Sequence, residues 1–199
     1  MIRCVMLDLD GTLLRKQGQK TAGISEENEL ALQRWQDAGG LAGIATSRSA
    51  GYIQNYSLRR WAAVVGWNGA VIEVGNSRRL HLLPKQDESQ LWKISGGDQR
   101  ENRVAMVTPD NWLVYDEQLP LVREYCANPR GWIQDHRRVR LWDPQRPDAK
   151  LAMILAVYPD ALAAQAVRLR VLAVNRGLNV IETSARTLMM VSAGVDKAR

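Results

Sequence analysis

The chain has 199 residues, 46% of them hydrophobic, which is enough to bury a sizeable core in one or two domains. No apolar run approaches the roughly 20 residues that cross a bilayer, and the N-terminus lacks a signal-peptide pattern, so we expect a soluble, cytoplasmic protein without a membrane partner. The net charge of +6 suits an anionic substrate, but the basic residues are spread along the chain, so charge alone does not indicate nucleic acid. Cys4 and Cys126 lack metal-ligand spacing, and we expect reduced thiols that pack as small apolar residues.

The first part of the chain alternates predicted strands and helices. Strands are predicted at residues 2–7, 41–45 and 62–65, and helices at residues 25–38 and from Tyr52 onward. This alternation is typical of a doubly wound α/β sheet, in which ligands bind outside the carboxyl ends of the strands.

The first helix has a clear start and stop. Ser25 is its expected N-cap, and Gly39 ends it. Leu30, Trp35 and Ala38 are expected to form its apolar side.

From Val71 the pattern changes. A β-hairpin is predicted at residues 71–83, and an α+β unit with helices against an antiparallel sheet follows. Within it, strands are predicted at residues 104–107, 112–115, 151–157 and 178–182, a long helix at 160–174, and a loop or sheet edge at 134–150.

Two aspartates, Asp8 and Asp10, follow the first predicted strand. In extended backbone, side chains two residues apart point to the same side. Carboxylates this close repel each other unless a cation neutralises them, and Mg²⁺ prefers such oxygen ligands. One aspartate could then act as a nucleophile while the other carries a proton. A plain polar turn is the alternative, but the apolar strand before this pair and Thr12-Leu13-Leu14 after it favour a site.

The segment from Val5 to Leu14 resembles the first motif of the haloacid dehalogenase (HAD) superfamily, an apolar strand followed by Asp-x-Asp-Gly-Thr-Leu. The resemblance implies a Rossmann-like core and a phosphatase with bound Mg²⁺, for which Asp8 and Asp10 are the metal candidates. It also implies that Asp8 attacks phosphorus to form an aspartyl-phosphate, while Asp10 protonates the leaving oxygen and then activates water.

Thr46 is similar to the second motif of the superfamily. There a hydroxyl holds a phosphoryl oxygen together with the backbone N–H of the next residue, here Ser47. Taken alone, residues 46–49 would also suit a helix N-cap.

A closer resemblance is to the Cof-type branch, which has Ala-Thr-Gly-Arg and Asn-Gly-Ala at the ends of the second and third strands. Here these segments read Ala45-Thr46-Ser47-Arg48 and Asn68-Gly69-Ala70, with serine where glycine is usual. Arg48 and Asn68 are thus candidates for substrate binding. Asn68 could equally adopt a left-handed turn.

The Cof-type branch carries an α+β cap that covers the active site and selects the substrate. The resemblance therefore implies a core at residues 1–84, a cap at 85–186 and a return to the core at 187–199. Gly194-Val195-Asp196-Lys197 is similar to the branch's lysine motif, with Ala198 where glycine is usual. This implies that Lys197 pairs with Asp8 and the phosphate; an ordinary charged tail residue is the alternative.

The sequence departs from the branch after Lys197. Members continue with a strand and a Gly-Asp-x-x-Asn-Asp motif whose aspartate completes the Mg²⁺ site, but this sequence ends at Arg199. A similar string at residues 97–102 lies inside the cap and reads as a surface turn. We expect a core that is incomplete at its C-terminus, weakened metal binding, and self-association through an uncovered edge of the first strand.

The leading hypothesis is a Mg²⁺-dependent phosphomonoester hydrolase for a small phosphorylated metabolite, such as a sugar phosphate. Related cap-bearing families that hydrolyse sucrose phosphate or mannosylglycerate phosphate, or move phosphate within hexoses, are one alternative. A truncated, weak or inactive remnant that binds phosphorylated ligands or a partner is another. A nucleic-acid binder would rest on a basic cluster and require strongly salt-dependent binding. That cluster comprises Arg137, Arg138, Arg140 and Arg146.

Overall fold

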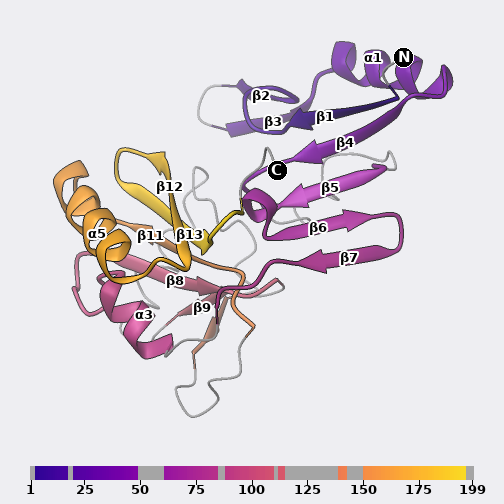
Figure 1. Ribbon diagram of the computed structural model, residues 1–199. Coiled ribbons are helices and arrows are strands. Elements are labelled where there is room, and N and C mark those ends of the chain that lie inside the picture. Colours follow the sequence, from indigo (N-terminus) through magenta and orange to yellow (C-terminus); the bar gives the residue numbers. More distant parts are fainter. Residues whose placement is uncertain are drawn as a thin grey trace. The chain divides into compact units, whose positions relative to one another are not determined.

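The computed structural model describes residues 3–17, 20–48, 61–84, 88–109, 112–114, 139–142 and 150–195. The chain divides into two compact units (Figure 1). Unit 1 comprises residues 1–80 and 196–199, and unit 2 comprises residues 81–195.

Unit 1 is built on a five-stranded sheet in the order β1-β4-β5-β6-β7. These strands are β1 (Cys4–Asp8), β4 (Leu41–Ala45), β5 (Ala63–Gly66), β6 (Val71–Val74) and β7 (Ser77–Leu80). β1, β4 and β5 run parallel, and β6 and β7 form the predicted hairpin. A smaller hairpin, β2 (Leu14–Gln17) with β3 (Lys20–Ile24), follows β1. The predicted α/β class is confirmed.

Helix α1 (Glu26–Asp37) begins after the predicted cap, Ser25, whose side chain accepts a hydrogen bond from the first turn. Its apolar side was predicted wrongly at Leu30, which is 51% exposed. Leu32 is buried instead, in a cluster with Ile44 of β4. Because successive helical residues lie about 100° apart, Leu30 and Leu32 occupy nearly opposite faces, and packing on β4 selects Leu32.

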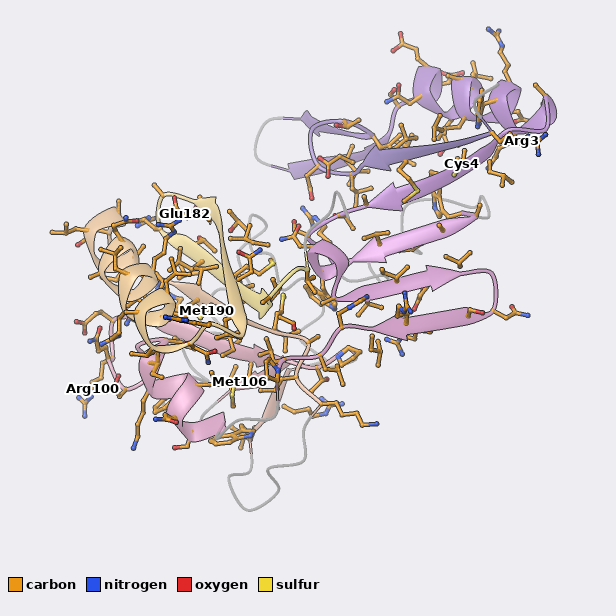
Figure 2. All side chains as sticks on the ribbon, in the orientation of Figure 1. Arg3, Cys4, Arg100, Met106, Glu182 and Met190 are labelled. Atoms are coloured by element: carbon orange, nitrogen blue, oxygen red, sulfur yellow. The ribbon has the colours of Figure 1, made fainter. Side chains whose placement is uncertain are left out.

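Strand β1 lies at one end of the sheet order, and among the described strands it pairs with β4 alone. Cys4 is therefore exposed rather than packed as expected, while Met6 is 46% exposed. Figure 2 shows Cys4 at the start of this strand. Cys126 lies outside the described residues.

Unit 2 contains a six-stranded sheet in the order β10-β9-β8-β11-β13-β12. Its elements are α3 (Glu88–Ile94), β8 (Arg103–Val107), β9 (Trp112–Val114), β10 (Val139–Leu141), β11 (Met153–Val157), α5 (Ala161–Val174), β12 (Leu178–Ser184) and β13 (Thr187–Ser192). Neighbouring strands are antiparallel except β9 and β10. β10 lies at the edge, within the stretch predicted to be a loop or edge.

The core of unit 2 lies between this sheet and the two helices (Figure 1). Ile154 of β11 stands opposite Met106 of β8 and Met190 of β13, and all three side chains are fully buried. Figure 2 labels Met106 and Met190. The sheet-facing side of α5 supplies Val167 and Val171. Helix and strands thus exclude water from each other's apolar faces, which is the main source of stability in such a layer.

The sequence predicted that residues 187–199 return to the first domain, whereas residues 187–195 belong to unit 2. The reason is that β13 is an interior strand of the second sheet, with hydrogen-bonded neighbours β11 and β12 on its two sides.

Candidate active site

The carboxyl ends of three parallel strands meet at one edge of the unit 1 sheet. Asp8 of β1 stands opposite Ala45 of β4, which in turn stands opposite Val65 of β5. The residue after β4, Thr46, is fully buried, and its N–H donates to the Val65 carbonyl at 2.8 Å. This register brings Asp8, which is half-buried, to the sheet edge at which Thr46 begins its loop.

The loop after β1 is a tight turn that fixes the position of Asp10. The N–H of Leu14 donates to the Leu9 carbonyl at 2.9 Å, and Leu9 is fully buried. Gly11 has φ of 84°, a conformation that side chains with a Cβ rarely adopt. Asp10, which forms a β-bridge with Leu14, is held at the start of this turn.

Arg48 forms a two-pronged ion pair with Asp10. Its Nε donates to Asp10 Oδ2 at 2.8 Å, and its Nη2 donates to Asp10 Oδ1 at 2.7 Å. The side chains are 17% and 36% exposed, so solvent weakens the attraction and the net stabilisation should be no more than about 1 kcal/mol. The ion pair contributes more to the orientation of Asp10 than to stability, because a guanidinium fork fixes the plane of the carboxylate that it binds. Sequence analysis did not predict this contact.

Besides the bond from Thr46 to Val65, three further hydrogen bonds hold the backbone around Thr46. Its Oγ1 accepts the N–H of Arg48 at 3.1 Å, and its carbonyl accepts the N–H of Asn68 at 3.0 Å. The N–H of Trp67 donates to the Arg48 carbonyl at 3.0 Å. The loops after β4 and β5 are thereby joined. Ser47, predicted to bind phosphate through its N–H, lies half-buried in the first of them.

Asn68 is buried and has φ of 54°, the left-handed conformation considered as one alternative for this residue. Trp67 before it has φ of 50°, which is uncommon for a bulky residue. Non-glycine residues in this conformation often mark functional sites, where surrounding contacts hold the strain. Sequence analysis missed Trp67 because its chemistry does not signal this conformation.

Mg²⁺ would suit the carboxylate of Asp8, whereas both carboxylate oxygens of Asp10 accept hydrogen bonds from Arg48. Mg²⁺ in phosphoryl-transfer sites commonly uses one or two carboxylates together with phosphate oxygens and water molecules. In the part of the chain that the structure describes, no group of three or more His, Cys, Asp or Glu side chains could hold a metal. The predicted phosphate ligand Lys197 lies outside the described residues.

The motif-like string at residues 97–102 is a structural turn after α3, as predicted. Asn102 is buried, and its Nδ2 donates to the Gly96 carbonyl at 2.8 Å and to Gln99 Oε1 at 3.0 Å. Asp98 beside it is exposed. The amide of Asn102 thus closes the turn on itself.

Asp8 and Asp10 thus lie at the carboxyl-end edge of the parallel strands, which is where α/β proteins bind their ligands. Residues 5–199 match the haloacid dehalogenase-like hydrolase family, and the chain belongs to that family. It is therefore a hydrolase, and the sequence-based assignment to the superfamily is confirmed. No curated protein matches the chain.

Solved structures of the superfamily share the fold. A HAD-superfamily phosphatase from Bacteroides thetaiotaomicron is 23% identical, with a TM-score of 0.76 over 100% of this chain and 69% of that chain. A haloacid dehalogenase-like hydrolase from B. subtilis is 18% identical, with a TM-score of 0.71 over 98% of this chain and 75% of that one. A HAD subclass IIB sugar phosphatase is 14% identical, with a TM-score of 0.72 over 98% of this chain and 72% of that one.

Among the described residues, no helix is both long enough and apolar enough to cross a bilayer.

Proposed function

We propose that this chain is a Mg²⁺-dependent phosphomonoester hydrolase that acts on a small phosphorylated metabolite, such as a sugar phosphate. The observation that carries the proposal is the register that sets Asp8 at the sheet edge beside the loop of Thr46. The similarity to a sugar phosphatase supports the substrate class.

The reaction begins with Asp8. Its carboxylate oxygen attacks phosphorus, a bond from Asp8 to phosphorus forms, and the bond from phosphorus to the leaving oxygen breaks. Asp10 gives its proton to that leaving oxygen. Asp10 then takes a proton from water, which attacks the aspartyl-phosphate, releases inorganic phosphate and regenerates Asp8.

Residues around Thr46 hold the phosphoryl group. Oγ1 of Thr46 accepts the N–H of Arg48, and the hydroxyl can donate its hydrogen to a phosphoryl oxygen. The N–H of Ser47 and the ammonium of Lys197 supply further donors. Asp8 and the backbone carbonyl of Asp10 would hold Mg²⁺, which offsets negative charge when the phosphate approaches the carboxylates.

Arg48 links substrate binding to proton transfer. Its two N–H groups occupy both carboxylate oxygens of Asp10, so at least one of these hydrogen bonds must open before Asp10 can pass a proton. A substrate phosphate offers the same fork an alternative bidentate partner. When the phosphate binds Arg48, it therefore releases Asp10 from the ion pair, and Asp10 can then act as general acid and base.

Hydrolysis of a generic aryl phosphate by the purified 199-residue chain, with and without Mg²⁺, tests the proposal. Asp8→Asn should abolish turnover and leave the thermal unfolding midpoint unchanged, because the amide keeps the shape of the side chain but is a poor nucleophile. Asp37→Asn, at an exposed acid of α1, is the matched control and should retain full activity. Equal turnover by the Asp8 variant would remove Asp8 from the mechanism. Tight phosphate binding without turnover by the unsubstituted chain would favour a non-catalytic binding module.

A further inference from the structure

Helix α5 is apolar on the side that faces away from its own sheet. Leu162 is 81% exposed, Leu169 58%, Leu172 41% and Val174 62%. Within unit 2, this helix lies with α3 on one face of the sheet (Figure 1). Single exposed apolar residues are ordinary, but several on one short helix mark an interaction surface.

The exposed residues follow a helix-packing pattern. Leu162, Ala166, Leu169 and Ala173 are all exposed and are separated by four, three and four residues. This spacing is the seam of a two-stranded coiled coil, in which each seam residue inserts between residues of the facing helix. We call these four residues the α5 seam.

We propose that the α5 seam docks against the α5 seam of a second copy of this chain, in antiparallel orientation. Large and small residues alternate along the seam. An antiparallel twofold pairing therefore places Leu162 opposite Ala173 of the second copy, and Ala166 opposite its Leu169. Each leucine meets a small residue, so the helices can approach closely, and the twofold symmetry closes the assembly as a dimer.

Charges at the two ends of the helix fit the same orientation. Asp160 caps the N-terminus of α5, Arg176 follows its C-terminus, and both are exposed. Antiparallel pairing brings Asp160 of each copy toward Arg176 of the other, and it also aligns the helix dipoles favourably. Parallel pairing would instead bring like charges together at both ends.

The sequence predicted self-association through the edge of β1. That edge offers a less continuous apolar surface than the α5 seam does. Met6 is 46% exposed there, but its parallel partner on β4 is Gly43, which adds no side chain. The α5 seam presents its residues along a helix of 14 residues, about 21 Å long. One helix pair falls below the roughly 1,200 Å² typical of tight complexes, so the dimer is weak and reversible.

Sedimentation velocity over a concentration series, from low to high micromolar, tests the proposal without using enzymatic activity. The unsubstituted chain should shift from monomer to dimer as concentration rises. Leu169→Glu puts a charge at the centre of the seam and should weaken association by at least about tenfold. Arg176→Glu should weaken it less, by opposing Asp160 at both ends.

Met6→Glu is the matched control, because it removes an exposed apolar side chain from the β1 edge and should leave the α5 dimer intact. Circular dichroism checks that each variant folds; if Leu169→Glu fails to fold, Arg176→Glu carries the test. A chain that stays monomeric at every concentration would overturn the proposal. So would a dimer that persists in the folded seam variants or is lost only with Met6→Glu, which would place the contact at the β1 edge.

Discussion

The sheets of the two units differ in where they place polar groups. In unit 1, Asp8, Asp10 and Thr46 gather where parallel strands end, and the loop after β5 contains Trp67 and Asn68 with positive φ. In unit 2, every residue of the central strand β11 is buried, and the adjacent strands place apolar residues opposite all of them except Val157, which stands opposite Arg103 and Thr187. Among the described non-glycine residues, positive φ occurs only in that loop of unit 1.

This contrast separates activity from stability. The loops of unit 1 hold chemically useful groups in fixed positions, at the cost of backbone strain. The strands of unit 2 contribute close packing, in which the loss of even a few methylene groups is felt. Substitutions at the strand ends of unit 1 should therefore change rates, whereas substitutions inside unit 2 should change the free energy of unfolding.

Among substitutions that leave the nucleophile Asp8 in place, the largest effect is expected from Asp10→Asn. Loss of the group that exchanges the proton should lower kcat by about 10²-fold to 10⁴-fold, the usual range for general acid–base catalysis. Steady-state kinetics with an aryl phosphate measures kcat, and urea unfolding should show a change of no more than about 1 kcal/mol, because the ion pair with Arg48 is partly exposed. A rate within a few-fold of the unsubstituted chain would assign proton transfer to water.

Ile154→Ala tests the expectation that substitutions inside unit 2 change the free energy of unfolding rather than the rate. Ile154 is fully buried at the centre of unit 2, and truncation should lower the free energy of unfolding by about 2–5 kcal/mol. Urea denaturation measures this loss, while kcat per folded molecule should stay unchanged. Leu30→Ala, at a residue that is 51% exposed, is the control and should change stability by less than about 0.5 kcal/mol. A large fall in kcat of folded Ile154→Ala would contradict the separation of roles.

A smaller effect is expected from Arg48→Lys, which keeps the positive charge but loses the two-pronged geometry. Lysine can satisfy one carboxylate oxygen at a time, so the expected loss in kcat/KM is about tenfold. The pH profile of kcat/KM should also change shape, because Asp10 is no longer held in one orientation. If added guanidinium restores the rate, the geometry of the fork rather than its charge is responsible. An unchanged rate and profile would limit Arg48 to a structural role.

The sequence predicted elements and strand-end motifs better than it predicted contacts. The α/β class, the cap of α1 at Ser25 and four strands of unit 2 (β8, β9, β11 and β12) followed from short-range patterns of apolar and capping residues, whereas β10 and β13 were not predicted as strands. The pairing of Arg48 with Asp10 was missed because it joins residues 38 positions apart and depends on the turn at Gly11. Likewise, residues 187–192 show a local strand pattern, but only their pairing with β11 and β12 assigns them to unit 2.

The smallest effect concerns Tyr158, which is buried in unit 2 and donates a hydrogen bond from its hydroxyl to the Ser95 carbonyl at 3.0 Å. Burial raises the pKa of Tyr158 well above its usual value of 10.0, and the nearby charge of Arg170 only partly opposes this. Tyr158→Phe loses the hydrogen bond and should destabilise the fold by about 1 kcal/mol at pH 8.

Raising the pH should erase this difference in the free energy of unfolding between the unsubstituted chain and Tyr158→Phe. Below about pH 10 the phenol is protonated in both the folded and the unfolded chain, so its contribution to stability is fully present. Above that pH the unfolded chain releases the proton while the folded chain keeps it, and the unsubstituted protein loses about 1.4 kcal/mol per pH unit relative to Tyr158→Phe. The other tyrosines are common to both proteins and cancel in the comparison. Urea unfolding of both at pH 8 and pH 11 should show the advantage of the unsubstituted chain vanish at the higher pH. A difference that stays constant would mean that the phenol ionises as easily in the folded chain as in the unfolded one.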